Sequence, residues 1–317
     1  MRSWLFDVQW GRARKHGSKA SDTGLDPLTE KNNPPPSVAG VLGRLRAAGL
    51  RPLRARDQHF LHDPRLLAAI VEDAEVSAQE RVFEVGTGPG TLTRELAAHA
   101  AQILTVDLDP KMIAFAQREL AACHNVRFLC ADVLDGRRVR REVAENLAPL
   151  GEFVWVGNLP YSIATTLIIA LLEGGFPWTR GLLLVQEEVA ARLSAVAGSR
   201  TYGPVTVLLA FWAECRRGRR VASGAFWPPP KVESAFIHLT ARAPLGTAAE
   251  YRSYAAWVRY LFGGRRKQLQ RLLRERIGRD SVSAGLQACG AAAEDRPERL
   301  APDAFLALAR EFPLDEI

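Results

Sequence analysis

Asn158, Leu159, Pro160 and Tyr161 stand directly after an apolar run at residues 153–156 that reads as a buried strand. An amide oxygen and a neighbouring main-chain carbonyl can accept both hydrogens of an exocyclic base amine, whose lone pair is otherwise delocalised into its ring. Proline removes a donor and fixes the turn, and a tyrosine ring offers a face for base stacking. These residue types suit attack by such an amine on an electrophilic methyl group, catalysed mainly by positioning. An ordinary strand-to-helix turn is the alternative.

A glycine-rich segment marks the end of an earlier predicted strand. In FEVGTGPGTLTREL, residues Glu84, Gly86, Gly88 and Gly90 stand where the strand turns into a helix. Glycines at such a turn let the backbone approach a ligand that a Cβ atom would exclude. The third glycine arrives one residue too early for the G-x-G-x-x-G of a dinucleotide fold, and no Gly-Lys-Ser/Thr of a P-loop is present.

Two acidic residues end the next two predicted strands. Asp107 occupies the tip of the second strand, where an acid typically holds the ribose hydroxyls of an adenosine cofactor. Asp132 ends the third strand, where it can accept from an adenine amino group; a helix cap is the alternative for each acid. Open α/β sheets bind ligands at such strand ends, and the spacing favours S-adenosylmethionine over NAD. Asn158 then stands at the fourth strand end of the same crevice.

The elements that must position these residues alternate along the chain. Strand-like apolar runs separated by amphipathic helical segments lie at 81–86, 103–108, 126–132, 152–158 and 181–187. This alternation predicts an α/β fold with a mostly parallel sheet covered on both faces. A late strand at 234–240 has no helix close behind it, and beyond about residue 245 the pattern is purely helical.

Three regions are predicted along the chain. Residues 1–38 are polar and rich in Gly, Pro and Ser, which predicts a disordered extension. This extension has no long apolar core, which argues against a secretory signal, and its acidic residues weaken an organelle presequence. Residues 39–244 are predicted to form the sheet domain that binds S-adenosylmethionine, and residues 245–317 a small helical domain.

The bulk composition narrows the function classes. The 317-residue chain has 42 Lys and Arg against 35 Asp and Glu, a net charge of +7 that favours a polyanionic partner without requiring one. No apolar stretch approaches the roughly 20 residues that span a bilayer, so no membrane partner is expected. The four cysteines are scattered without a C-x-x-C pair, and the six histidines lack metal-ligand spacing. We therefore expect free thiols in a reducing cytoplasm and no metal site.

Taken in order, these motifs resemble the rRNA adenine N6-dimethylases, and among them the small-subunit (16S) rRNA dimethyladenosine transferases. The resemblance covers about residues 52–312. One Asn-Leu-Pro-Tyr is only moderately specific, but the set in this order is very specific. Its segments are DQHFLHD (57–63), FEVGTGPGTLT, VDLDPKM, NLPYSIATTLI, QEEVAARLSAVAGSRTYGPVTVLLAF (186–211), AFWPPPKVESAFIHL (225–239) and FGGRRKQLQRLL (262–273).

The resemblance implies a class I S-adenosylmethionine-dependent methyltransferase, with a Rossmann-like, mostly parallel seven-stranded sheet and an all-helical C-terminal domain. It implies S-adenosylmethionine as methyl donor and no metal. The implied substrate is a pair of adjacent adenosines in the 3′-terminal hairpin of small-subunit rRNA, converted to N6,N6-dimethyladenosine within an immature 30S-type particle. A cytoplasmic monomer with a role in small-subunit biogenesis is expected.

The resemblance also implies roles for individual residues. Tyr161 and Phe226 would sandwich the target base beside Asn158, Leu159 and Pro160; the alternative for Phe226 is an apolar residue before a rigid turn at 228–230. The expected cofactor set is His59, Leu61, Glu84, Gly86, Gly88, Asp107, Asp132 and Asn158.

Three positions depart from the family pattern. His59 stands where the family usually has Asn, Asp107 where Glu is usual, and Ser162 where Asn is common after the tyrosine. An imidazole can still bond the methionine end of the cofactor, and Asp107 shortens the reach to the ribose by one methylene. None of the three removes a chemically necessary group.

Basic clusters predict where RNA would bind. One predicted helix sets six cations against Glu275, and further clusters lie at 137–141 and 216–220. Together they fit a surface that tracks phosphates, although a solvated helix face is the alternative for each. The helix cations are Arg265, Arg266, Lys267, Arg271, Arg274 and Arg276, and the RNA contacts expected are Arg265, Arg266, Lys267, Arg271 and Lys231.

Three other functions compete with this interpretation. A resistance-type methyltransferase acting on a large-subunit rRNA adenosine shares the sheet and the motifs, but the segments around 201–209 and 225–235 favour the small-subunit reading. A non-catalytic RNA-binding or ribosome assembly factor is disfavoured by the intact motif at 158–161. An NAD dehydrogenase would need a different glycine spacing.

Overall fold

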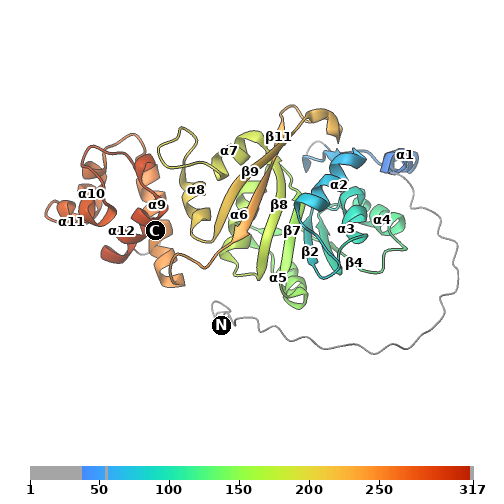
Figure 1. Cartoon of the computed structure of the whole chain (residues 1–317), viewed down its shortest axis with the longest axis horizontal. Helices are drawn as coiled ribbons and strands as arrows, with labels where there is room; N and C mark the ends of the chain where they lie inside the picture. The colour runs from blue at the N-terminus through green and yellow to red at the C-terminus, as the bar shows by residue number, and fades with distance from the viewer. Residues whose placement is uncertain (1–37, 54–55, 315–317) are drawn as a thin grey trace.

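The computed structural model describes residues 38–53 and 56–314. Its centre is a seven-stranded sheet in the order β4-β3-β2-β7-β8-β11-β9, with helices on both faces (Figure 1). Within this sheet, β11 runs antiparallel to its neighbours, and the other pairs are parallel. The predicted α/β fold is confirmed. The strands of the sheet are β2 (Arg81–Val85), β3 (Gln102–Asp107), β4 (Val126–Cys130), β7 (Phe153–Asn158), β8 (Trp178–Gln186), β9 (Ala213–Val221) and β11 (Ser234–Ala241).

Two apolar layers hold the sheet between its helices. Successive residues of β7 alternate between them: Val154 and Val156 pack with α2 and α3, and Trp155 packs with α5 and α6. Both faces of a parallel strand are thereby buried, which explains the continuous apolar run in the sequence. The helices beside the sheet are α2 (Pro64–Asp73), α3 (Thr91–Ala97), α4 (Pro110–Glu119), α5 (Arg141–Leu147), α6 (Ala164–Glu173), α7 (Glu187–Leu193) and α8 (Pro204–Ala210).

Asp-Pro pairs set where two of these helices begin. Asp63 accepts a hydrogen bond from the amide of Arg65 at the start of α2, and Asp109 accepts one from Lys111 at the start of α4. Each aspartate caps the helix, and the proline that follows suits its first turn. The cap at Asp109 keeps the turn after β3 short, so Asp107 stays at the strand end.

The strand β9 is an element that the hydrophobic pattern did not predict. It lies at the edge of the sheet, paired with β11 alone, and it carries the basic cluster at 216–220. Charged side chains are common on edge strands because they discourage pairing with another chain. The apolar alternation used to recognise strands is therefore weak here.

After β11 the described residues contain helices and turns only. They are α9 (Ala248–Gly263), α10 (Leu269–Ile277), α11 (Val282–Cys289) and α12 (Pro302–Glu311). Their apolar core surrounds Trp257 and Phe305, and it also takes in Tyr202, Val207 and Phe211 from the segment around α8. The hydroxyl of Tyr202 donates to the carbonyl of Leu300 at 2.8 Å. The predicted helical region after residue 245 thus shares its core with α8.

A further helix, α1 (Val38–Ala47), packs beside α4. Val41 and Leu45 lie against Phe60 and against the buried residues Met112 and Phe115 of α4. Except for Val38, the extension predicted over residues 1–38 lies outside the described residues. The short pairs β1 (Phe60–Leu61) with β10 (Phe226–Trp227), and β5 (Leu134–Asp135) with β6 (Arg138–Val139), complete the fold.

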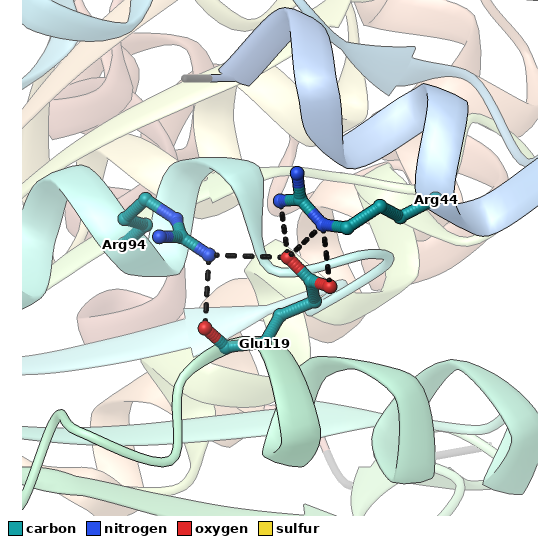
Figure 2. A network of polar contacts seen from close by, with 3 residues as sticks. All are labelled: Arg44, Arg94 and Glu119. Atoms are coloured by element: carbon teal, nitrogen blue, oxygen red, sulfur yellow. Dashed lines mark hydrogen bonds and ion pairs between the residues drawn. The ribbon is translucent and has the colours of Figure 1, made fainter. Parts of the chain in front are cut away.

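Figure 2 shows the polar network that fastens α1. Arg44 from α1 donates to Glu119 at the end of α4 through Nε at 2.9 Å and Nη2 at 2.5 Å, and Arg94 from α3 donates to the Glu119 carbonyl at 2.9 Å. The hydrogen bond from Arg44 lowers the pKa of the Glu119 carboxyl. Because Phe60 lines the cavity described below, α1 supports one wall of that cavity from behind. None of the helices in the described residues is long and apolar enough to cross a membrane.

Candidate active site

A cavity of about 220 Å³ opens at the carboxyl ends of β2, β3, β4 and β7. These strands lie side by side in the sheet, so their ends meet at one edge. The cavity is lined by the strand-end residues Gly86, Asp107, Asp132 and Asn158. The sequence therefore placed these four residues at one site correctly.

The glycine-rich turn after β2 forms the floor of the cavity. Gly86 and Gly88 have φ angles of +93° and +52°, which residues with a Cβ rarely adopt. A Cβ at Gly86 would lie 3.1 Å from the carbonyl oxygen of Asn158, and one at Gly88 would lie 3.0 Å from the Phe60 ring. The glycines therefore let the turn after β2 approach both the turn after β7 and Phe60.

Asp107 ties this turn to the second strand. Its Oδ2 accepts from the amide of Gly88 at 2.8 Å, and its Oδ1 accepts from the amide of Asp109 at 2.8 Å. Burial raises the pKa of the Asp107 carboxyl, and these two backbone hydrogen bonds oppose that shift. A carboxylate has about four lone-pair sites, so Asp107 can also accept from two ribose hydroxyls.

The far side of this end is formed by Asp132 and an apolar side chain. The Oδ1 atom of Asp132 accepts from the amide of Leu134 at 3.0 Å, which orients the carboxylate. Leu108, which follows Asp107 in the chain, lines the same cavity and is 51% exposed. A flat base can lie against such an exposed apolar side chain. Sequence reasoning missed Leu108, whose signal was an apolar residue between two acids in VDLDP.

The other end of the cavity holds the motif at 158–161. Asn158 donates from Nδ2 to the carbonyl of His59 at 2.8 Å. Because a carbonyl can only accept, this contact assigns the amide orientation and directs Oδ1 away from His59 as an acceptor. The hydroxyl of Tyr161 shares a hydrogen bond of 2.6 Å with Ser234, and burial raises the Tyr161 pKa. The acceptor and the aromatic ring predicted from the sequence are thus both fixed in place.

The segment 56–59 crosses the cavity and joins its two ends. At the cofactor end, Arg56 forms an ion pair with Asp109 at 3.2 Å, and Gln58 donates to the same carboxylate at 3.1 Å. At the target end, Asp57 accepts from the amide of Ser162 at 3.1 Å. The motif DQHFLHD stands out in the sequence, but it predicts no role for Arg56, Asp57 or Gln58.

The expected sandwich of Tyr161 and Phe226 is not formed. Phe226 is 2% exposed and belongs to the apolar layer on the α2 and α3 side of the sheet, because β10 pairs with β1 and sets Phe226 opposite Leu61. Neither Phe226 nor Leu61 lines the cavity. The ring beside Tyr161 is that of His59, with centroids 5.7 Å apart and planes at 24°.

Glu84 also lies behind the wall of the cavity. It is completely buried and accepts from the hydroxyls of Thr93 and Thr105 at 2.7 and 2.6 Å, while Oε1 has no hydrogen-bond partner. Burial raises the Glu84 pKa to about 7. The Thr105 hydroxyl also bonds that of Thr87 in the glycine-rich turn at 2.6 Å. Glu84 thus supports the turn instead of lining the cavity.

The basic residues predicted to lie on one helix are divided between a turn and a helix. Arg265, Arg266 and Lys267 occupy the turn between α9 and α10, because Gly263 and Gly264 end α9 and α10 begins only at Leu269. The prediction of a helix across these three residues is wrong.

Several of these cations are paired within the chain. Lys267 and Arg271 both bond Glu275, at 2.9 and 3.0 Å, and Arg265 lies 3.7 Å from Glu298. Arg266 and Lys231 are exposed. Exposed ion pairs of this kind contribute little stability, so they leave the cations able to exchange partners.

The residues present fit an adenosine-containing methyl donor. The glycines form a cradle that a Cβ would fill, two carboxylates stand at neighbouring strand ends, and an oriented amide faces the same cavity. Within the residues that the structure describes, no group of three or more His, Cys, Asp and Glu side chains could hold a metal ion.

Known proteins share both this sequence and this structure. The family described as ribosomal RNA adenine dimethylase matches residues 54–312. Ribosomal RNA small subunit methyltransferase A of Latilactobacillus sakei is 33% identical over 246 residues, which is 77% of this chain and 82% of the relative. The protein of the same name from Trichormus variabilis is 33% identical over 269 residues, 82% of this chain and 97% of the relative.

Solved structures agree with the fold. The crystal structure of the 23S rRNA methyltransferase ErmE has a TM-score of 0.63 and 27% identity, covering 80% of this chain and 100% of that one. A dimethyladenosine transferase from Plasmodium falciparum has a TM-score of 0.66 and 22% identity, covering 80% of this chain and 97% of that one. With its family match extending over most of its length, the chain belongs to the ribosomal RNA adenine dimethylases, which are S-adenosylmethionine-dependent methyltransferases.

Proposed function

We propose that this enzyme transfers methyl groups from S-adenosylmethionine to the N6 amines of two adjacent adenosines in the 3′-terminal hairpin of small-subunit rRNA. The product is N6,N6-dimethyladenosine, formed as a cytoplasmic monomer acts on an immature 30S-type particle. The observation that carries this proposal is the orientation of Asn158: its Nδ2 donates to His59, so its Oδ1 is the acceptor that an adenine amine requires.

The cofactor end would hold the donor through groups that the sheet already positions. Asp107 accepts from the ribose hydroxyls, Asp132 from the adenine amine, and the turn at 86–88 approaches the ligand closely. When bound, S-adenosylmethionine supplies an electrophilic methyl group. The hydrogen bonds that Asp107 already makes to Gly88 and Asp109 mean that little reorganisation accompanies binding.

The target end would prepare the amine for attack. Asn158 Oδ1 and a main-chain carbonyl of the turn accept the two N6 hydrogens, which withdraws the nitrogen lone pair from the adenine ring. Tyr161 stacks on the base, and its hydrogen bond to Ser234 holds the ring in position. Transfer then needs alignment of the nitrogen with the methyl group, and catalysis comes mainly from positioning.

A second candidate is methylation of a large-subunit rRNA adenosine. It is favoured by the similarity to the 23S rRNA methyltransferase ErmE, at 27% identity and a TM-score of 0.63. The curated relatives at 33% identity cited above carry the small-subunit name, and they support the first candidate. Both candidates use the same cavity, so the site alone does not choose between them.

Mapping the product on both rRNAs tests the proposal. Immature small subunits and large-subunit rRNA are each incubated with the enzyme and methyl-labelled S-adenosylmethionine, and the modified nucleosides are located by mass spectrometry. We expect N6,N6-dimethyladenosine at two adjacent positions of the small-subunit 3′-terminal hairpin. Label confined to large-subunit rRNA would establish the second candidate, and label in neither RNA would overturn both.

A further inference from the structure

Three separate parts of the target end meet at His59. Its main-chain carbonyl accepts from Asn158 Nδ2 at 2.8 Å, and its Nδ1 lies 2.7 Å from the carbonyl oxygen of Pro228. Its ring lies against that of Tyr161, with centroids 5.7 Å apart. These partners belong to the turn after β7 and to the proline-rich segment after β10, which do not adjoin His59 in the sequence. One residue thus contacts the amide, the stacking ring and the proline turn.

The contact with Pro228 also fixes the state of the imidazole. A carbonyl oxygen can only accept, so His59 Nδ1 carries the hydrogen in this bond. The donor geometry sets the ring orientation, and the ring then limits how far Tyr161 can turn. Tyr161 is held from the other direction by its hydrogen bond of 2.6 Å to Ser234, which is fully buried. The stacking ring is therefore restrained at its hydroxyl and at its face.

We propose that His59 is a positioning residue for the target adenine: it holds Asn158, Tyr161 and the turn at Pro228 in register. In this chain it is the second aromatic ring of the target end, since Phe226 is buried in the layer behind β1 and β10. The proposal rests on the proposed function, because it assumes that the target base enters beside Tyr161. It differs from the role expected from the sequence, in which this position bonds the methionine end of the cofactor.

Two variants separate the two side-chain contacts of His59. His59→Asn can still donate to Pro228 from a position equivalent to Nδ1 but lacks the ring, whereas His59→Phe keeps a ring against Tyr161 but cannot donate. His59→Ala removes both contacts. His99→Asn is the matched control, since His99 is exposed just beyond the end of α3 and does not line the cavity.

Single-turnover methyl transfer and cofactor affinity are measured on the full chain with each variant. We expect His59→Ala to slow transfer from the saturated complex about 10- to 100-fold, the effect of a displacement near 1 Å at a reacting group. His59→Asn and His59→Phe should each recover part of the rate, and the affinity for S-adenosylmethionine should stay within about threefold. A loss of cofactor affinity with an unchanged saturated rate would instead make His59 a cofactor ligand and overturn the proposal, as would an unchanged rate in all three variants.

A spectroscopic readout keeps this test separate from the proposed function. The nitrogen NMR shifts of His59 in the free enzyme should show a single Nδ1–H tautomer, and His59 should lose this signature if the Pro228 contact is absent. If the parent enzyme methylates neither rRNA while this signature is present, the proposed function fails and the contact geometry stands. If methylation is observed but the tautomer is mixed, the positioning role fails alone.

Discussion

At the cofactor end of the cavity, Asp107 bonds two backbone amides that lie 19 and 2 residues away in the sequence. At the target end, Asn158 bonds His59 across 99 residues, and His59 bonds Pro228 across 169. The first end is built within successive strand-to-helix turns of the sheet. The second is assembled from three distant segments and depends on the tertiary structure around them. Changes at the two ends should therefore affect different steps of the reaction.

The largest effect should follow from removing the oriented acceptor at the target end. Asn158→Ala should slow single-turnover methyl transfer by about 100-fold or more, because a positioned polar group acts most strongly in the transition state. The affinity for RNA should change little. Single-turnover assays at saturating RNA and cofactor measure this. A variant that transfers methyl groups at the parent rate would show that Asn158 does not hold the amine.

Glu84 tests whether the support behind the cofactor end is a neutral acid. Burial raises its pKa to about 7 in the folded state, so the folded chain binds this proton more tightly than the unfolded chain does. Its stabilising contribution is complete below the ordinary pKa near 4.5 and is lost as pH rises to about 7, a fall of about 3 kcal/mol in the free energy of unfolding.

Urea denaturation of the parent and of Glu84→Gln at pH values of about 5 and 7.5, either side of most of this fall, measures the difference. The variant cannot ionise at this position, so it should gain stability relative to the parent as pH rises. Comparing the two proteins cancels the other carboxyls, including Glu119, whose pKa is lowered. Parallel pH profiles for parent and variant would contradict a raised pKa at Glu84.

A smaller and more local effect is expected at the second strand end. Asp107→Ala should weaken S-adenosylmethionine binding by roughly 1.5–3 kcal/mol, the scale of a charge-assisted hydrogen bond. It also leaves the amides of Gly88 and Asp109 without their acceptor. RNA binding should be nearly unchanged. Calorimetry gives the cofactor affinity, with Asp107→Asn as the control that keeps one acceptor oxygen; unaltered affinity in the alanine variant would refute the ribose contact.

The smallest effect for each residue concerns the turn between α9 and α10. Substituting Arg265, Arg266 and Lys267 together by alanine should lower RNA affinity and flatten its salt dependence by roughly 0.7–0.9 in log–log slope for each phosphate that the protein no longer neutralises. Cofactor affinity should not change. Filter binding at several salt concentrations measures the slope, and Arg310→Gln on α12 is the control. A slope equal to that of the parent would mean that these cations only keep the surface solvated.

The comparison of the two ends also explains what the sequence could predict. Asp107 and Asp132 were recognisable because each follows an apolar strand pattern within a local unit of the sheet. The burial of Phe226 was not, since it depends on the pairing of β10 with β1, far apart in the chain. The same holds for the crossing segment at 56–59, whose partners are recognisable only in the folded protein.

Local signals that were present were also misjudged. Gly263 and Gly264 interrupt the helix that was predicted across Arg265–Lys267, and glycines commonly end helices. Tyr202 and Phe211 join the core of the helical region, although they precede the last two strands of the sheet in the sequence. Which layer an apolar residue joins is decided by chain topology, and a periodic pattern carries no information about it.

The central claim is that one cavity holds the methyl donor at the strand ends of β2 to β4 and the target adenine beside Asn158. A crystal structure of the chain with S-adenosylhomocysteine and adenosine monophosphate bound tests it most directly. The account predicts ribose hydroxyls on Asp107, the cofactor adenine beside Asp132 and Leu108, and the second base on Tyr161 with its amine at Asn158 Oδ1. A cofactor bound without contact to Asp107, or a base bound away from Tyr161, would contradict it.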